Sequence, residues 1–441
     1  MSHINKKRIL YRNDKPIVGE GVVVYWMNRE CRVRDNWALL YAKERADERK
    51  APLVVVYNLV NKYLGGGSRQ WDFKVKGLID VENELQALGI PFILLLDIQR
   101  KSAHSSSTHE TLNTHSFGHL TYLMENDDIY SHISTALNSL WNVQVGEIIT
   151  DFSPEKHMRA WTEKVLTSSD VSVTVLDAHN IVPVHIASQK REFGAYTLRP
   201  KIHKLLKEFL EPFPAIRTHT HVLLDKNKAN KEREGIKWER ILEIADVSNQ
   251  DNSVDTKTYN TPVNWIIPGE AHAKKALKTF TEHGLKMYHK RNDPLTDAQS
   301  NLSPYLHYGH IAPQRVALAV WEDSGVKDIE KLMDEHKNAA GVEEMKKGDL
   351  NSLFHSRSAN HSAFLEELIV RRELADNFCF YTSEYDSPVC FPDWAQKNIE
   401  HTKKDIREYI YSYPQFENAK THDALWNAAQ MQLLKTGKMH G

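Results

Sequence analysis

GVVVYWM (21–27) and APLVVVYNLV (51–60) are two unbroken apolar stretches, and they decide the fold of the first part of the chain. Similar stretches recur at IPFILLLD (90–97), EIITDF (147–152) and SVTVLDA (172–178). Strands of a parallel sheet are covered on both faces and therefore read as continuous β-branched runs. Helical patterns lie between them, in DNWALLYAKERADERK (35–50), where Asp35 is the predicted N-cap, and in FKVKGLIDVENELQALG (73–89). This alternation predicts an α/β fold with a doubly wound parallel sheet.

The character of the chain changes after about residue 265. The β-branched runs stop there, and helical periods such as AHAKKALKTFTEHGLKMYH and SAFLEELIVRRELADNFCFY take over. A polar, charged stretch, 214–262, separates the two parts. We therefore expect an α/β domain over 1–200, an interdomain linker over 201–264 and a helical domain over 265–441. Residues 325–358 form a predicted insertion between two helices of this second domain.

The composition limits the class of protein. The 441 residues carry 57 basic and 58 acidic side chains, so any DNA contact requires a local basic patch instead of a global positive field. No stretch is apolar enough for a membrane span, and the N-terminus lacks a secretory signal. Three scattered cysteines predict neither a disulfide framework nor a metal site, and the His-rich stretch 101–117 has no ligand spacing. We expect an intracellular protein, cytoplasmic if the source is prokaryotic, that is monomeric and makes no membrane contact.

Small polar side chains precede a predicted helix in SNLSPYLHYGHI (300–311). Ser300, Asn301 and Ser303 offer amides and hydroxyls where a helix begins, which suits an anion such as a phosphate. An ordinary capped helix explains the same residues.

A basic stripe lies just upstream, within 271–291. It contains Lys274, Lys275, Lys278, Lys286, Lys290 and Arg291, with Glu282 as its single acidic residue. Such a stripe could follow a nucleic-acid backbone, and a solvated helix face would account for it equally well.

Charged residues also interrupt an apolar helix in FLEELIVRRELADNF (364–378). Glu367 and Arg371 are four residues apart, as are Arg372 and Asp376, which is the spacing of helical ion pairs. The surrounding apolar residues predict that this helix is largely buried. Its charges then need partners or a ligand, so they indicate either a binding site or a buried structural network.

THDALWNAAQMQLLKTGKMHG (421–441) ends the chain, with Trp426 at the start of a predicted helix. From the residues alone, this tryptophan is more readily a core residue than a redox-active one.

In this order the segments resemble the class II cyclobutane pyrimidine dimer photolyases of the photolyase/cryptochrome family. The resemblance covers nearly the whole chain. The motifs that carry it are VVVYWMNRECRVRDNWAL, ITDFSP, DAHNIVPV, NWIIPGEAHAKKAL, KRNDP, SNLSPYLHYGHI, ELIVRRELADNFCFY and KTHDALWNAAQ with GKMHG.

The resemblance implies a fold and a reaction. The fold is a Rossmann-like N-terminal domain, which in this family can hold an antenna chromophore, followed by a helical domain that binds FAD. Reduced FADH⁻ absorbs light and donates an electron to a pyrimidine dimer in UV-damaged DNA, and the cyclobutane ring opens. The dimer is flipped out of the duplex for this step.

The resemblance also implies site residues. Glu367 corresponds to the carboxyl group that hydrogen-bonds the dimer, and Trp426 to a member of the tryptophan chain that carries electrons to the flavin. The cofactor residues are Tyr288, Ser300, Asn301, Leu302, Ser303, Met439, His440 and Gly441. The DNA-binding residues are Lys290, Arg291, Asn292 and Arg371.

Members of the family continue well beyond GKMHG, so we expect this chain to be C-terminally truncated, with an incomplete flavin pocket and weak or absent FAD retention. Two other functions remain open at this stage: a cryptochrome-like flavin photoreceptor and a non-catalytic remnant that keeps only DNA binding or a partner surface. Glu367, Arg291 and the basic stripe favour repair over reception.

Overall fold

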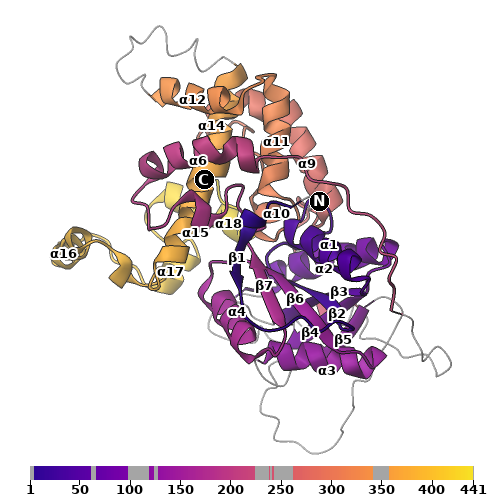
Figure 1. Cartoon of the computed structure of the whole chain (residues 1–441). Helices are drawn as coiled ribbons and strands as arrows, with labels where there is room; N and C mark the ends of the chain where they lie inside the picture. The colour runs from indigo at the N-terminus through magenta and orange to yellow at the C-terminus, as the bar shows by residue number, and fades with distance from the viewer. Residues whose placement is uncertain are drawn as a thin grey trace, which may run out of the picture.

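The computed structural model describes residues 4–60, 66–97, 119–123, 128–223, 238, 241–242, 262–340 and 357–440. Its N-terminal region contains a seven-stranded sheet in the order β1-β7-β6-β2-β3-β4-β5 (Figure 1). The strands are β1 (Ile9–Arg12), β2 (Val22–Met27), β3 (Leu53–Val60), β4 (Phe92–Asp97), β5 (His119–Leu123), β6 (Val145–Asp151) and β7 (Ser172–Leu176). Neighbouring strands pair in parallel, except β1, which is antiparallel to β7.

Helices cover both faces of this sheet, as the alternating pattern predicts. Helices α1 (Trp37–Arg49) and α2 (Ser68–Ala87) pack on the face that carries Val23, Tyr25 and Met27. The opposite face packs against α3 (Ile129–Trp141) and α4 (Lys156–Ser168). All five predicted strands are present, and the doubly wound arrangement is confirmed.

The sequence pattern missed two details of this region. Strand β1 is partly exposed at the edge of the sheet, so it has no continuous apolar run to reveal it. The predicted cap of α1 is wrong by one residue, because Asn36 accepts hydrogen bonds from the Ala38 and Leu39 amides at 3.1 Å each. Asp35 instead has a φ of 54° and binds Arg315 at 2.7 Å.

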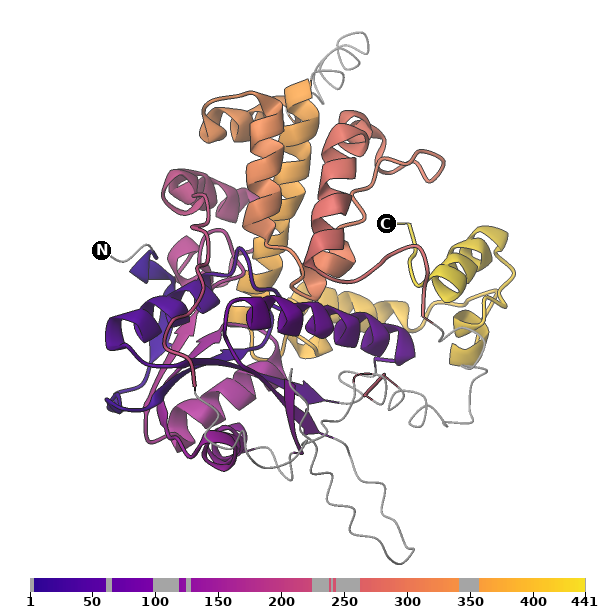
Figure 2. The ribbon, with the colours of Figure 1, turned by 90° about the vertical axis from the view of Figure 1, so that its right-hand side faces the viewer.

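The helical region lies above the sheet in both views (Figures 1 and 2), and α14 (Arg357–Leu365) is its central helix. It packs against η3 (Gly284–Lys290), α11 (Pro313–Ser324) and α12 (Ile329–Ala340). The chain around them forms α5 (Val184–Ala187), α6 (Ala195–Phe209), α9 (Glu270–Glu282), α10 (Ser303–His307), η5 (Glu366–Arg371) and α15 (Arg372–Tyr381). The expectation of a mainly helical region beyond residue 265 is confirmed.

Helix α6 belongs to this helical core although it spans the expected boundary between the α/β domain and the linker. Its residues Leu198, Ile202 and Phe209 are buried with residues of α9 and α14. The expected boundary at residue 200 therefore falls inside a helix. Much of the expected linker, together with 101–117 and 341–356, lies outside the described residues.

The last described segment projects away from both cores (Figure 2). It contains η6 (Pro388–Cys390), α16 (Asp393–Thr402), α17 (Tyr413–Glu417) and α18 (Ala424–Thr436), and none of these elements has a buried residue. Trp265 Nε1 donates to the Thr436 carbonyl at 2.7 Å, and Arg69 donates to the Leu434 carbonyl at 2.8 Å. These bonds tie the end of α18 to the rest of the molecule. Among the described helices, none combines the length and apolar character needed to cross a membrane.

Candidate functional site

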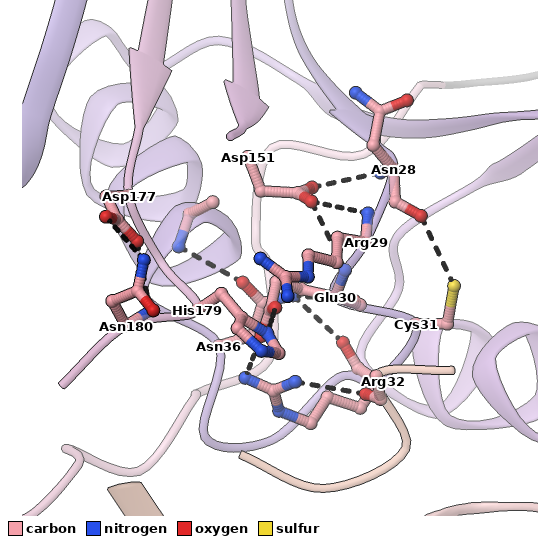
Figure 3. A network of polar contacts seen from close by, with 12 residues as sticks. Asn28, Arg29, Glu30, Cys31, Arg32, Asn36, Asp151, Asp177, His179 and Asn180 are labelled. Atoms are coloured by element: carbon pink, nitrogen blue, oxygen red, sulfur yellow. Dashed lines mark hydrogen bonds and ion pairs between the residues drawn. The ribbon is translucent and has the colours of Figure 1, made fainter. Parts of the chain in front are cut away.

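The carboxyl ends of β2 and β6 carry a buried polar network (Figure 3). Asp151, which ends β6, accepts hydrogen bonds from the backbone amides of Asn28, Arg29 and Glu30 at 2.9, 2.6 and 3.2 Å. Burial and, next, the charge of Glu30 raise the pKa of Asp151 to about 6. The amide bonds fix the loop that follows β2, at the position where the strand order of the sheet reverses.

Glu30 is a second carboxylate of this network, and it contacts the guanidinium of Arg32 and the imidazole of His179. The guanidinium of Arg32 lies against one of its oxygens, and His179 Nδ1 lies 2.6 Å from the other. Burial lowers the pKa of His179 well below its usual range, so this imidazole is neutral at pH 7. These contacts hold the loop after β2, although Asn28 Oδ1 and Glu30 Oε2 have no hydrogen-bond partner among the described residues.

Arg29 joins this edge of the sheet to the helical region. Its guanidinium makes bidentate contacts of 2.6 and 3.2 Å with Asp376 of α15. Burial alone would raise the pKa of Asp376, but the charge and hydrogen bonds of Arg29 outweigh it and hold that pKa well below its usual range. The expected pairing of Arg372 with Asp376 is wrong, because Arg372 contacts Glu373 at 3.1 Å and leaves Asp376 to Arg29.

Glu373 makes the second contact between α15 and the α/β region. It accepts a hydrogen bond of 2.6 Å from the backbone amide of Ile181. Burial raises the pKa of Glu373 to about 8, despite the opposing charge of Arg372. Together, the contacts of Glu373 and Asp376 fix the helix that leads back to the charged signature segment.

That segment is not a regular α-helix. Residues Glu366–Arg371 form a π turn, in which the Arg372 amide bonds the Glu367 carbonyl, five residues back. Glu366 and Glu367 are adjacent in sequence but have different environments. Glu366 is fully buried against Arg199 of α6, with three contacts of 2.6 to 3.1 Å, whereas the Glu367 side chain is 38% exposed. Turns of this kind occur frequently at functional sites.

Three other predicted site residues, Tyr288, Arg291 and Arg371, lie near Glu367. Arg371 Nε lies 3.4 Å from Glu367 Oε1, and Arg291 Nη2 lies 3.8 Å from the same oxygen. The guanidinium of Arg291 also lies over the ring of Tyr288, 4.9 Å from its centre. Burial raises the pKa of Tyr288 to about 12, so its hydroxyl is protonated at pH 7. A partly exposed carboxylate thus lies between two guanidinium groups beside an aromatic ring.

The predicted phosphate-binding segment lies against the end of the chain. Lys438 donates a short hydrogen bond to the Asn301 side chain, and Asn301 has a φ of 54°. Both residues line a cavity of about 280 Å³ with Trp265, Gln299, Gln432, Thr436 and His440. The buried Nε2 of His440 has no hydrogen-bond partner among the described residues. Burial lowers the pKa of Lys438.

The other predicted cofactor residues of these two segments are not part of the lining of this cavity. Leu302 is buried in the helical core, the Ser300 hydroxyl accepts a bond of 3.3 Å from the Leu302 amide, and Ser303 begins α10. Met439 is 36% exposed, and Gly441 lies outside the described residues.

The remaining predicted residues lie on the surface. Lys290 and Asn292 are exposed on either side of Arg291. Trp426 is 44% exposed and its ring packs edge-on against Phe416, with 5.4 Å between centroids. No contact described for Trp426 connects it with Glu367 or with the cavity. In the basic stripe, Lys274 is paired with Glu270. This acidic residue lies one position before the range 271–291, so the expected charge count did not include it.

Sequence reasoning missed three residues that the structure brings to these sites. Lys438 directly precedes the predicted Met439, and its position in GKMHG was an available signal. Arg199 and Glu366 gave no such signal, because they are 167 positions apart in the chain and form a pair only after folding.

A separate cavity of about 420 Å³ opens at the carboxyl edge of the sheet. Its lining comes from the ends of β2, β3 and β6 and from α2, α4 and α10, and includes Arg29, Asn58, Trp71, Lys74, Trp161 and His307. Clefts at a strand-order reversal are the usual ligand sites of doubly wound sheets.

The known proteins that this chain resembles in sequence all carry the name of one enzyme family. The family model described as DNA photolyase matches residues 23–104. The chain is 36% identical over 421 residues to the deoxyribodipyrimidine photo-lyase of Potorous tridactylus, covering 95% of this chain and 64% of the relative. It is 33% identical to that of Arabidopsis thaliana, with 96% and 71% covered, and 30% identical to that of Methanothermobacter thermautotrophicus, with 100% and 80% covered. This chain therefore spans between 64% and 80% of the length of these relatives.

Solved structures agree on the fold. A class III photolyase from Agrobacterium tumefaciens superposes with a TM-score of 0.55 at 18% identity, covering 96% of this chain and 70% of that one. A Synechocystis cryptochrome superposes with a TM-score of 0.56 at 14% identity, covering 100% and 74%. At these identities the likeness concerns the fold alone, an α/β sheet followed by a helical region.

Proposed function

This chain belongs to the deoxyribodipyrimidine photo-lyase family of DNA-repair flavoproteins, and from that membership we propose that it is a class II enzyme that splits cyclobutane pyrimidine dimers in light. The observation that carries the proposal is the convergence of Tyr288, Arg291, Glu367 and Arg371 in one partly exposed group. Class II is proposed from the charged segment 364–378 and the motifs that accompany it.

The charges of this group suit a flipped-out, damaged dinucleotide. The Glu367 carboxylate accepts hydrogen bonds from the base edges, as carboxylates do with exocyclic amino and imide groups. Arg291 and Arg371 supply guanidinium groups for the phosphates that flank the lesion. The exposed Lys290 and Asn292 extend this surface along the strand. The lost stacking of a dimer makes flipping less costly than for an intact pair.

The residues around Asn301 fit the phosphate part of a flavin dinucleotide. Lys438, Asn301 and His440 Nε2, which has no hydrogen-bond partner within the described part of the chain, form a donor set suited to an anion. The cavity of about 280 Å³ is smaller than the roughly 300–1,000 Å³ of pockets that enclose a whole ligand. We therefore assign to these residues the phosphates and not the whole of FAD, with Ser300, Leu302, Ser303, Met439 and Gly441 as neighbours of the same site. Reduced FAD, when bound, supplies the photoexcited electron for ring opening.

Trp426 is proposed to relay electrons toward the flavin. Its partial exposure and its contact with Phe416 suit a surface member of an electron-transfer chain. The division into an α/β domain over 1–200, a linker over 201–264 and a helical domain from 265 is retained as a proposal, with α6 packed on the helical side.

An antenna chromophore is proposed for the cavity of about 420 Å³ at the carboxyl edge of the sheet. Trp71, Trp161 and Tyr308 offer aromatic surfaces, and the charged groups Arg29, Lys74 and Glu155 also line the cavity. Such a lining fits a planar aromatic pigment that carries polar groups. The Sulfolobus tokodaii photolyase, which this fold resembles, contains two FAD molecules, with a novel light-harvesting cofactor implicated.

The test of the proposed function is light-dependent repair. The chain is incubated with reduced FAD and an oligonucleotide that contains one thymine dimer, and intact thymines are counted after illumination and after an equal time in the dark. We expect loss of the dimer in the light only. Loss in neither condition, with the dimer bound no more tightly than undamaged DNA, would instead favour a photoreceptor or a non-catalytic remnant.

A further inference from the structure

The π turn Glu366–Arg371 lies inside a longer helical stretch that has two different environments. Upstream, Phe364 packs between Phe280 and Tyr288, with ring centroids 4.7 and 5.2 Å apart. Downstream, Asp376 contacts the α/β region through Arg29. A π turn inserts one residue, which rotates everything after it by about 100° relative to a regular α-helix. The turn thus allows one helix to satisfy both environments.

The same helix holds the segment that carries Tyr288 and Arg291. Asn360, which is buried on α14, accepts a hydrogen bond of 3.0 Å from the His289 amide. Its side-chain amide donates to the Lys286 carbonyl at 2.8 Å. The backbone before Arg291 is therefore fixed to α14 two helical turns before Glu367.

Glu366 fixes the other end of this arrangement. It is 0% exposed, and its two oxygens receive the Nε and Nη2 donors of Arg199. A bidentate pair of this kind restrains direction as well as distance. Adjacent residues of a helix point about 100° apart, so a fixed direction for Glu366 also sets the direction of Glu367.

We propose that Arg199 and Glu366 are positioning residues for Glu367: their buried ion pair holds the π turn in the conformation that places the Glu367 carboxylate between Arg291 and Arg371. Neither residue needs to touch the substrate for this role. The inference rests on the proposed function for its catalytic consequence, but its geometric content stands independently.

The test uses variants that remove the pair without leaving a buried charge. Arg199→Met combined with Glu366→Leu replaces both charges by apolar groups of similar size. Proteins commonly tolerate such a double replacement, whereas removal of one partner of a buried ion pair lowers the stability strongly. We expect this double variant to keep its thermal midpoint and its affinity for undamaged DNA. Its repair rate at saturating dimer should fall at least about tenfold, since a misplacement of ~1 Å can cost about 100-fold. Arg199→Lys, which keeps the charge but loses the fork, should recover part of the rate.

A coupling experiment separates positioning from a general loss of stability. If Glu366 acts through Glu367, the double variant should cause no further loss of rate in a Glu367→Gln background. Independent losses that multiply in the triple variant would overturn the proposal, as would a double variant that repairs within about twofold of the parent. If the double variant does not fold, Glu366→Gln, which removes one charge but not the side-chain volume, enters the same comparison.

The crystal structure of the double variant provides a readout that needs no repair activity. We expect residues 366–371 to lose the π turn or the Glu367 carboxylate to move away from Arg291. An unchanged turn with the 3.8 Å approach intact would overturn the proposal. If the parent chain fails to repair DNA at all, the proposed function fails, and this structural comparison still decides the role of Arg199 and Glu366.

Discussion

The sheet of the N-terminal region and the segment formed by α16 to α18 differ in the burial of their apolar side chains. Every residue of β2 is buried, including Trp26 at 0% exposure. In the C-terminal segment Trp394 is 73% exposed, Ile410 82% and Leu425 80%. The difference shows that the two parts depend on different interactions: the sheet is stabilised by its own core, while α16 to α18 keep their shape through local caps and a few bonds to α2 and Trp265.

The largest effect should come from the ion pair that links the sheet to α15. Arg29→Met leaves Asp376 buried without its partner, which typically costs ~3–5 kcal/mol of the free energy of unfolding. Arg407→Met in the exposed segment is the matched control, since Arg407 is exposed and bonds only the nearby Thr402 carbonyl among the described residues. Urea denaturation of both variants measures the difference. Equal losses of stability would show that the two regions do not differ as described.

The pH dependence of stability sharpens the same comparison. Glu373 has a folded pKa of about 8, above its ordinary value of 4.5, so the folded chain holds a proton that the unfolded chain releases. Its contribution to stability is therefore complete below pH 4.5 and is lost as the pH rises to about 8. Glu373→Gln should flatten stability over that window, as followed by urea midpoints at pH 5 to 8.

Asp376, on the same helix, makes a contribution to stability whose pH dependence has the opposite sign. Its folded pKa lies below the ordinary 3.8, so its stabilisation is present above that pH and is lost as the pH falls below it. A Glu373→Gln variant whose stability still declined between pH 5 and 8 as steeply as the parent would contradict the assignment to Glu373.

The smallest effect is expected for Trp394→Ser in α16. This side chain is 73% exposed, so its removal should change the free energy of unfolding by no more than about 0.5 kcal/mol. Thermal unfolding of the variant measures this. A loss of several kcal/mol would mean that the segment has a buried core of its own, and the contrast with the sheet would then not hold.

The same contrast explains how far the sequence could predict the fold. Runs such as GVVVYWM identify strands because burial on both faces demands unbroken apolar residues, and the structure confirms each predicted strand. Strand β1 was not predicted because it is a short edge strand whose last two residues, Tyr11 and Arg12, are exposed. The expected boundary at residue 200 divided α6, because the place of this helix in the helical core depends on contacts with α12 and η5, and both are far along the chain.

The candidate site was predictable only in part for a similar reason. The i,i+4 spacing of Glu367 and Arg371 is a local signal, and their ion pair is present. The buried partners of the neighbouring charges are not local: Arg199 for Glu366, and Arg29 for Asp376. The π turn also has no signature in this sequence, since it results from reconciling two tertiary environments along one helix.

The most direct test of the account is light-dependent repair by Glu367→Ala. This variant is compared with the parent and with Glu48→Ala, which removes an exposed, ion-paired carboxylate on α1 of the α/β region. At saturating dimer and equal absorbed light, we predict that Glu367→Ala lowers the repair rate by about tenfold or more, because a hydrogen bond to a charged group is worth ~1.5–3 kcal/mol and each ~1.4 kcal/mol changes a rate tenfold. Glu48→Ala should match the parent. An unchanged repair rate in Glu367→Ala would contradict the central claim that this carboxylate contacts the dimer.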